Sequence, residues 1–193
     1  MKLGIFGGTF DPPHLGHLTV AEEAWQTCGL DRVVFIPCHQ SPHKETAPGA
    51  TDDQRLEMVR LMVAGRPWAD VSDWELRRPG RSYSWETAEH FSAQFPDAEL
   101  HWILGADQWN ALPRWARPDV LARMLTFIVF PRKGLPRHPI DGFRAVFLQG
   151  RVDVSLVSST GIRSCIGSGK SASGLALEAV LAFIAAHELY RKK

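Results

Sequence analysis

The chain has 193 residues, enough to bury a sizeable core in one domain but few for two, so we expect a single domain over residues 1–193. It is 45% hydrophobic and 22% charged, as globular proteins are, and its net charge of +1 gives no bulk electrostatic reason to expect nucleic-acid or membrane binding. The scattered Cys28, Cys38 and Cys165, the lack of a signal peptide and the lack of a membrane-length apolar run predict a cytoplasmic protein.

The first half of the chain alternates apolar strands with amphipathic helices. We expect strands at residues 2–7 and 32–37, separated by a helix over residues 15–27 that ends at Gly29. Thr51 caps a second helix that runs to about residue 64. A strand is expected over residues 71–76, then a basic loop, and then a helix over residues 84–94 capped by Ser84.

The second half continues the alternation. Strands are expected at residues 100–104, 126–130, 145–148 and 152–157, with short helical pieces between residues 108 and 123. Residues 132–142 form an exposed loop, and helices over residues 159–166 and 175–189 close the chain. Apolar strands that alternate with helices predict a Rossmann-like α/β fold, in which helices cover both faces of a parallel sheet.

The most informative stretch comes directly after the first strand. Gly7 and Gly8 allow a ligand to approach the backbone, and the helix that follows points its N-terminal N–H groups at the same place, which favours phosphate. His14 and His17 share one face of that helix, with Gly16 between them, and can donate hydrogen bonds to phosphate oxygens. An isolated pair of this kind is more often a capping or solvated pair, but strand, glycines, turn and helix together favour a phosphate site.

These histidines could alternatively be ligands of a metal ion. His14, His17, His39 and His43 have ligand-like spacings, but only Asp11 is an obvious carboxylate partner, so we expect no protein-held metal.

Two later stretches offer polar groups beside a strand end. Residues 158–163 open a helix with hydroxyls, amides and Arg163, which suits either a phosphate cradle or an ordinary helix cap. Gly105 and Asp107 follow another strand, where the carboxylate could accept hydrogen bonds from a ribose or cap a helix. Lys44 lies in a loop and could neutralise a triphosphate or simply be solvated.

The order of these stretches resembles one enzyme family. Residues 7–17, Gly-Gly-Thr-Phe-Asp-Pro-Pro-His-Leu-Gly-His, resemble the signature of the H-x-G-H nucleotidyltransferases, and in particular their nicotinate-nucleotide adenylyltransferase branch. Pro42-His43-Lys44 and Ser158-Ser159-Thr160-Gly161-Ile162-Arg163 are similar to further motifs of that branch.

The resemblance implies a role for each motif residue. His14, His17, Lys44 and Arg163 are implied as the catalytic set. The implied ATP site comprises Gly7, Gly8, Thr9, the Phe10 backbone, Gly105, Asp107, Ser158, Ser159 and Thr160 together with both histidines and Arg163. The implied acceptor site comprises Lys44, Tyr83, Ser84, Thr87 and Trp115, with amides near Tyr83 and Ser84 for the nicotinate carboxylate and Trp115 against its ring, unless this tryptophan belongs to the core.

The implied reaction transfers the adenylyl group of ATP to nicotinate mononucleotide, with Mg²⁺ held through the ATP phosphates. The sequence departs from the family at Ser84, at Ala116, and at Cys38 and His39, all on the acceptor side. Three alternatives therefore stay open: another acceptor such as nicotinamide mononucleotide or 4′-phosphopantetheine, a non-catalytic nucleotide-binding regulatory domain, and a fragment of a class I aminoacyl-tRNA synthetase, for which the chain is short.

Overall fold

The computed structural model describes residues 1–42, 47–131, 138–150, 154 and 157–191. Its framework is one parallel sheet in the order β3-β2-β1-β4-β5-β6. This order and the parallel pairing are those of a Rossmann-like fold, so the predicted fold class is confirmed. The strands are β1 (Lys2–Gly8), β2 (Arg32–Pro37), β3 (Ala69–Val71), β4 (Glu99–Gly105), β5 (Leu125–Phe130) and β6 (Arg144–Phe147).

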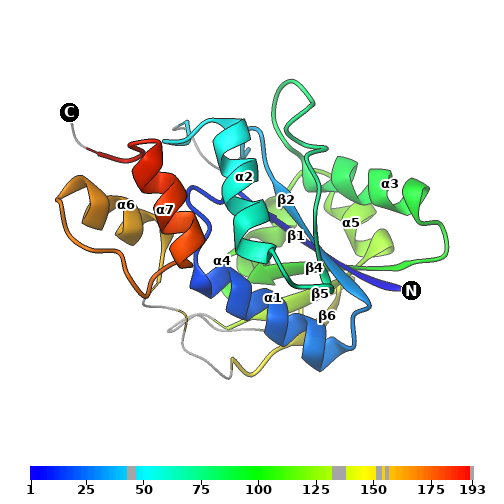
Figure 1. The fold of residues 1–193 in the computed structure, drawn as a ribbon. Helices are drawn as coiled ribbons and strands as arrows, with labels where there is room; N and C mark the ends of the chain where they lie inside the picture. Colours follow the sequence, from blue (N-terminus) through cyan, green and yellow to red (C-terminus); the bar gives the residue numbers. More distant parts are fainter. Residues whose placement is uncertain (43–46, 132–137, 151–153, 155–156, 192–193) are drawn as a thin grey trace.

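Helices cover the sheet on both faces (Figure 1). One face packs against α1 (Leu15–Cys28), α2 (Asp52–Val63), α6 (Ser159–Gly167) and α7 (Glu178–Ala186). The other face packs against α3 (Ser84–Gln94), α4 (Ala106–Ala111) and α5 (Pro118–Met124), with the short 3₁₀ helix η1 (Leu112–Arg114) between the last two. Among the described residues, no helix combines the length and the apolar character that crossing a membrane requires.

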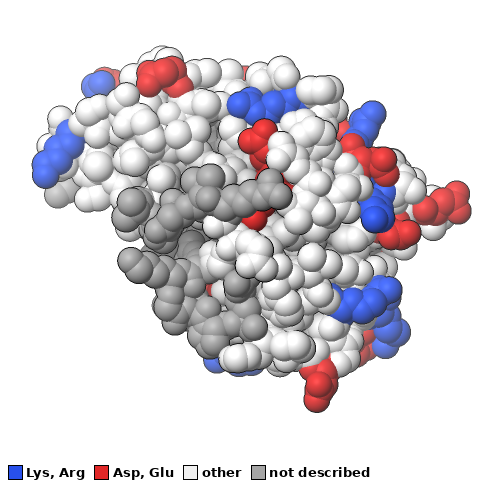
Figure 2. Space-filling view, turned by 90° about the horizontal axis from the view of Figure 1, so that it is seen from below, with Lys and Arg blue, Asp and Glu red and all other residues white. Residues whose placement is uncertain are grey.

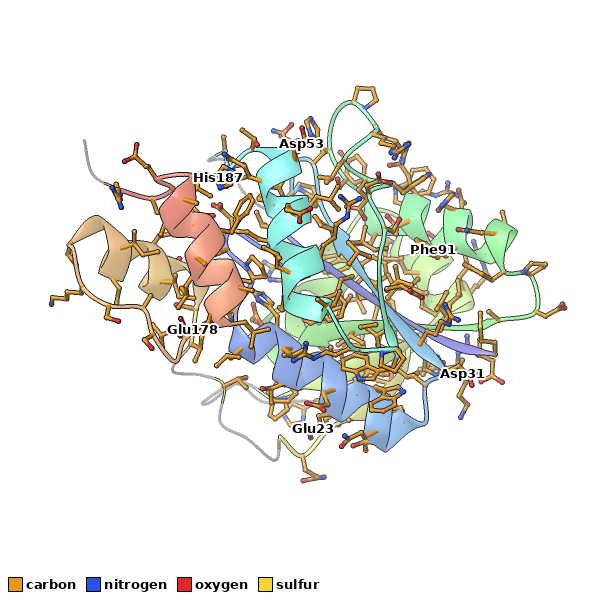
Figure 3. The ribbon with its side chains drawn as sticks, in the orientation of Figure 1. Glu23, Asp31, Asp53, Phe91, Glu178 and His187 are labelled. Atoms are coloured by element: carbon orange, nitrogen blue, oxygen red, sulfur yellow. The ribbon has the colours of Figure 1, made fainter. Side chains whose placement is uncertain are left out.

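The central strands are apolar because both of their faces are covered. In β1, Leu3 and Ile5 pack into the α3 layer, whereas Phe6 packs into the α1 layer. Phe91 of α3 packs in the same apolar cluster as Leu3 and Ile5 (Figure 3). On the other side of the sheet, Asp53 lies in the first turn of α2 (Figure 3). Burial on both faces explains why β1, β2, β4 and β5 are almost continuous apolar runs.

The prediction of a strand over residues 71–76 is wrong. The strand β3 ends at Val71, and the next residues turn because their polar side chains bond locally. Ser72 Oγ accepts from the Trp74 amide, and the carbonyl oxygen of Asp73 accepts from the amides of Leu76 and Arg77. Glu75 therefore lies in a turn and not in a strand.

Other differences concern element ends. The helix α7 begins at Glu178 and not at residue 175, and residues 187–189 form turns after it. The N-cap of α3 is Tyr83 and not Ser84, which is the first helical residue. The strand expected at residues 152–157 lies outside the described residues apart from Val154 and Val157, which are not in a strand, and residues 132–137 of the expected loop also lie outside them.

Candidate active site

A cavity of about 490 Å³ opens at the carboxyl ends of β1 and β4. The chain leaves β1 towards β2 on one side, while β4 and β5 continue the sheet on the other, so the loops diverge here. Parallel sheets bind ligands at such a point. Gly7 and Gly8 line the cavity from β1 and Thr9 from the residue after it, while Gly105 lines it from the end of β4 and Asp107 from the first turn of α4.

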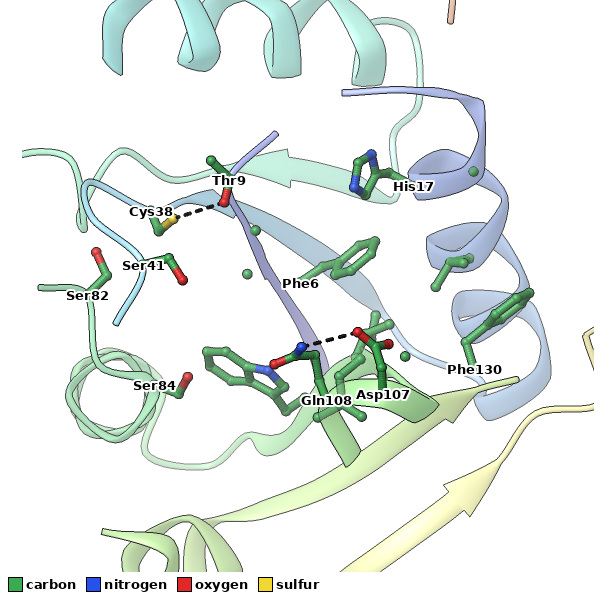
Figure 4. Close-up of a pocket in the computed structure, with 18 of the residues that line it drawn as sticks. Phe6, Thr9, His17, Cys38, Ser41, Ser82, Ser84, Asp107, Gln108 and Phe130 are labelled. Atoms are coloured by element: carbon green, nitrogen blue, oxygen red, sulfur yellow. Dashed lines mark hydrogen bonds between the residues drawn. The ribbon is translucent and has the colours of Figure 1, made fainter. Parts of the chain in front are cut away.

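The cavity has two main walls, seen on opposite sides in Figure 4. The β1–α1 wall, residues 7–17, carries His17 on the right of that view. The α3 wall, residues 75–84, carries Ser82 and Ser84 on its left. Cys38 and Ser41 lie next to the α3 wall, and Asp107 and Gln108 close the base.

The glycines at the end of β1 lie close to aromatic side chains, which would have to shift to make room for a Cβ. A Cβ on Gly8 would lie 3.0 Å from the Phe10 ring, and one on Gly7 would lie 3.1 Å from Trp102. The Phe10 side chain is 1% exposed and packs in the core against Phe6 and Phe35, so it does not line the cavity. The small residues thus leave the backbone of β1 open to the cavity.

The two histidines line the cavity as a stacked pair. Their ring centroids are 3.7 Å apart, and the His14 backbone N–H donates to Nδ1 of His17 at 3.2 Å. Because that nitrogen accepts, the neutral ring of His17 carries its hydrogen on Nε2 and can donate it. A Cβ on Gly16 would come within 3.0 Å of His14 Nδ1, which explains the glycine between them.

Asp11 anchors the β1–α1 wall from behind. Its carboxylate is buried and accepts hydrogen bonds from the amides of Gly49 (2.8 Å) and Ala50 (3.1 Å) and from the hydroxyl of Tyr190 (2.7 Å). Burial raises the pKa of the Tyr190 hydroxyl, so it stays a donor. The sequence offered Asp11 only as a metal candidate, whereas in the structure protein donors occupy its carboxylate.

The N-terminus of α6 is attached to the same wall. Arg163 donates from Nη1 to the Asp11 carbonyl oxygen at 2.6 Å, and Ser159 Oγ donates to the Pro12 carbonyl oxygen at 2.9 Å. Ser158 caps α6, and Thr160 accepts from Arg163. The side chains of residues 158–163 lie beside the cavity but do not line it, although Val154 and Val157 do.

The loop after β2 reaches the cavity through Cys38, Ser41 and Pro42. The Cys38 amide donates to the Gly8 carbonyl oxygen, and its sulfur lies 3.8 Å from Thr9 Oγ1. Next to it, the ring of His39 bonds Asp52 and its amide donates to Ser82 Oγ. Lys44, predicted to contact phosphate, lies outside the described residues.

The predicted acceptor residues differ in their placement. Ser84 and Trp115 line the cavity, and Trp115 packs edge-on against Trp102 with centroids 6.4 Å apart. Tyr83 does not line it, and Thr87 is fully buried behind the wall. Its hydroxyl donates to the cavity-lining Glu75 and also lies 3.5 Å from the carbonyl oxygen of Tyr83.

Glu75 is the buried acidic residue among the described lining residues that the sequence analysis did not assign to the site. It is 5% exposed, lines the cavity and accepts a hydrogen bond from Thr87 Oγ1 at 2.6 Å. Burial raises the pKa of its carboxyl group to about 7, against the opposing effects of Thr87, Ser82 and Arg78. The expected strand over residues 71–76 hid it, because a buried glutamate in a turn leaves no periodic signal.

Two observations bear on a resident metal and on the charge of one face of the molecule. They contain no group of three or more His, Cys, Asp or Glu side chains that could hold a metal ion. On the face drawn in Figure 2, the coloured lysines, arginines, aspartates and glutamates of the described residues are interspersed, and neither charge forms a continuous patch.

Comparison with known proteins adds a family model, two relatives and one solved structure to which this chain is similar. The cytidylyltransferase-like family model matches residues 5–165. A protein of Gloeobacter violaceus, named "Probable nicotinate-nucleotide adenylyltransferase", is 39% identical over 98% of this chain and 96% of its own, and a Listeria monocytogenes protein of the same name is 37% identical over 100% and 98%. The structure of Plasmodium falciparum nicotinic acid mononucleotide adenylyltransferase complexed with NaAD has the same fold, with a TM-score of 0.81 at 14% identity over 98% of this chain and 97% of that one.

Proposed function

The chain belongs to the cytidylyltransferase-like family and, within it, to the nicotinate-nucleotide adenylyltransferases, and from this premise we propose how its cavity performs their reaction. It is a nucleotidyltransferase that transfers the adenylyl group of ATP to nicotinate mononucleotide and releases deamido-NAD and pyrophosphate. The observation that carries the proposal is the stacked pair His14 and His17. This pair lines the cavity at the carboxyl ends of β1 and β4, where the loops of the parallel sheet diverge.

The chemical step is an in-line displacement. A phosphate oxygen of nicotinate mononucleotide attacks the α-phosphorus of ATP, a new P–O bond forms, and the bond to the bridging oxygen of the β-phosphate breaks. Pyrophosphate leaves with that bonding pair. No covalent enzyme intermediate is needed, so the protein contributes mainly positioning and charge stabilisation.

His17 contributes the central donor. Its Nδ1 accepts a hydrogen bond from the His14 amide, which places the ring hydrogen on Nε2, and we propose that Nε2 donates to the α-phosphate oxygens as charge develops on them. His14 supports it by stacking and donates from the same face. The first amides of α1 add positive potential at the same place.

The remaining ATP contacts extend outward from this centre. The open backbone of Gly7, Gly8 and Thr9 admits the nucleotide, and Gly105 and Asp107 lie where a ribose can be bound. Arg163 and the N-terminus of α6, with Ser158, Ser159 and Thr160, lie beside the cavity, and together with Lys44 they are proposed to hold the β- and γ-phosphates. Arg163 keeps donors beyond those that bond Asp11 and Thr160.

The acceptor is proposed to bind along the α3 wall. Trp115 offers its ring to the pyridine, and the amides near Tyr83 and Ser84 at the start of α3 face its carboxylate. Thr87 takes part through Glu75, to which its hydroxyl donates. The phosphate of the acceptor then points towards the β1–α1 wall.

We propose Mg²⁺ as the divalent ion that accompanies ATP. It would be held by phosphate oxygens and water, since Asp107 is the only acidic side chain near the predicted ATP contacts in the described cavity lining. Bound there, it neutralises triphosphate charge.

We also propose that residues 1–193 form one domain in the cytoplasm. Both apolar clusters pack on the same sheet, which supports one domain, and the three cysteines are free thiols, which supports a reducing compartment.

Pyrophosphate release tests the proposal directly. The full chain is incubated with ATP, Mg²⁺ and nicotinate mononucleotide, with nicotinamide mononucleotide and 4′-phosphopantetheine in parallel reactions. We expect release to be fastest with nicotinate mononucleotide. Binding of ATP without release with any acceptor would contradict the proposal and favour a regulatory nucleotide-binding role.

A further inference from the structure

The α3 wall contains a carboxyl group that the reaction above does not use. Glu75 is 5% exposed, yet it lines the cavity together with Ser82 and Ser84. It accepts a hydrogen bond from the hydroxyl of Thr87, a residue that is itself fully buried, and the side chain of Ser82 also favours its ionised form by hydrogen bonding. A buried carboxylate normally needs a cation beside it, and Glu75 forms no ion pair within the described part of the chain.

The nearest cation is engaged elsewhere. Arg78 donates two hydrogen bonds of 3.0 Å to the Glu86 carboxylate, and its guanidinium lies 4.5 Å from the centre of the Trp74 ring. Its charge is therefore largely balanced by Glu86 and not by Glu75. Asp107 lines the same cavity from the first turn of α4 and adds no positive charge.

This arrangement bears on the acceptor, so the inference rests on the proposed function. Nicotinate and nicotinamide mononucleotide differ by one group on the pyridine ring, an anionic carboxylate against a neutral carboxamide. That ring is proposed to bind between Trp115 and the start of α3, on the wall that contains Glu75. An ionised Glu75 would repel the first acceptor, whereas the uncharged acid would not.

We propose that Glu75 is a specificity-determining residue whose protonated form admits the pyridine carboxylate, and whose ionised form favours a neutral carboxamide instead. The hydroxyl of Thr87 positions the group, and Arg78 and Glu86 set the local charge around it. Preference for nicotinate mononucleotide then depends on pH in a way that the phosphate chemistry does not.

The titration of the group agrees with this geometry. Burial raises the pKa of Glu75 to about 7, with Arg78 lowering it and Glu86 raising it as the charged neighbours. Glu75 therefore gains or loses its proton within the pH range in which the enzyme can be assayed. The pyridine carboxylate stays ionised throughout this range.

The test compares the two acceptors across pH. The ratio of kcat/KM for nicotinate over nicotinamide mononucleotide cancels the titration of the shared phosphate and of the histidines. For the unmodified chain we expect this ratio to fall about tenfold between about pH 6 and about pH 8.5. Glu75→Gln cannot ionise and should keep the ratio high and constant within about twofold.

Two further variants separate specificity from folding. Glu89→Gln removes an exposed carboxylate from α3 that does not line the cavity, and its ratio should follow the unmodified chain. Thr87→Val removes a donor that favours the ionised form of Glu75, so the fall should move to higher pH. A merely structural role would lower turnover of both acceptors without moving this midpoint.

The possible results are distinct. A ratio that is constant with pH in the unmodified chain, or that falls equally in Glu75→Gln, would overturn the inference. Absence of turnover with both acceptors at every pH would contradict the proposed function instead.

Discussion

The two walls of the cavity are held by different kinds of contact. Behind the β1–α1 wall, the Asp11 carboxyl group accepts hydrogen bonds from two amides and a tyrosine hydroxyl and lies 3.7 Å from Arg163. Behind the α3 wall, Glu75 accepts a neutral hydroxyl and has its nearest arginine engaged by another carboxylate. The first wall is held in place by several hydrogen bonds to one buried carboxyl group, which suits catalysis, whereas the second contains a carboxyl group whose charge can change near neutral pH, which suits a choice between acceptors.

The largest effect that this contrast predicts is on catalysis from the β1–α1 wall. His17→Ala removes the Nε2 donor and should lower kcat by about 100- to 1,000-fold. The loss should be equal for nicotinate and nicotinamide mononucleotide, because the donor acts on the α-phosphate and not on the acceptor ring.

Steady-state kinetics with both acceptors measures this loss. His187→Ala, an exposed histidine near the end of α7, is the control and should retain activity. A fully active His17→Ala chain would mean that another group is the donor.

The contrast also separates what the sequence could predict from what it could not. The β1–α1 wall was predictable because its glycines and histidines are contiguous, so local geometry alone brings them together. The contacts that Asp11 makes behind this wall could not be predicted, because Asp11 and Tyr190 are 179 residues apart in the sequence. Glu75 was missed because its partner Thr87 comes from a helix after an intervening turn, which periodicity within either segment cannot reveal.

A second prediction concerns the stability of the β1–α1 wall. Asp11→Ala leaves the amides of Gly49 and Ala50 and the Tyr190 hydroxyl without their acceptor. The free energy of unfolding should fall by about 3 to 5 kcal/mol. Denaturation by urea measures this, with Asp70→Ala as the control.

Asp70 pairs with Arg32 on the surface, where both side chains are about half exposed. Its removal should cost less than about 1 kcal/mol. Equal losses in the two variants would show that Asp11 is not the anchor of this wall.

Glu75 of the α3 wall should make the stability of the protein depend on pH near neutrality. Folded Glu75 keeps its proton up to about pH 7, whereas an unfolded glutamate releases it near 4.5. Unfolding thus releases a proton between these values, so stability falls as pH rises through this window. Glu75→Gln does not titrate, and its stability relative to the unmodified chain should grow by about 3 kcal/mol across the window.

Urea denaturation at several pH values tests this difference, and Glu89→Gln serves as the exposed control. The relative stability of Glu89→Gln should stay nearly constant with pH. If the difference in free energy of unfolding between Glu75→Gln and the unmodified chain stayed constant with pH, Glu75 would not titrate in this window. The proposed contrast between the two walls would then be wrong.

The smallest effect comes from the outermost contact of the β1–α1 wall. Tyr190→Phe removes the hydroxyl that donates to Asp11 at 2.7 Å but keeps the ring, which packs close to Gly49. Because the amides of Gly49 and Ala50 still satisfy the carboxylate, the free energy of unfolding should fall by only about 1 to 2 kcal/mol. The ratio between the two acceptors should not change, since this contact lies behind the wall that acts on the α-phosphate. A changed acceptor ratio in Tyr190→Phe would mean that the two walls are coupled, and the division of roles between them would then be wrong.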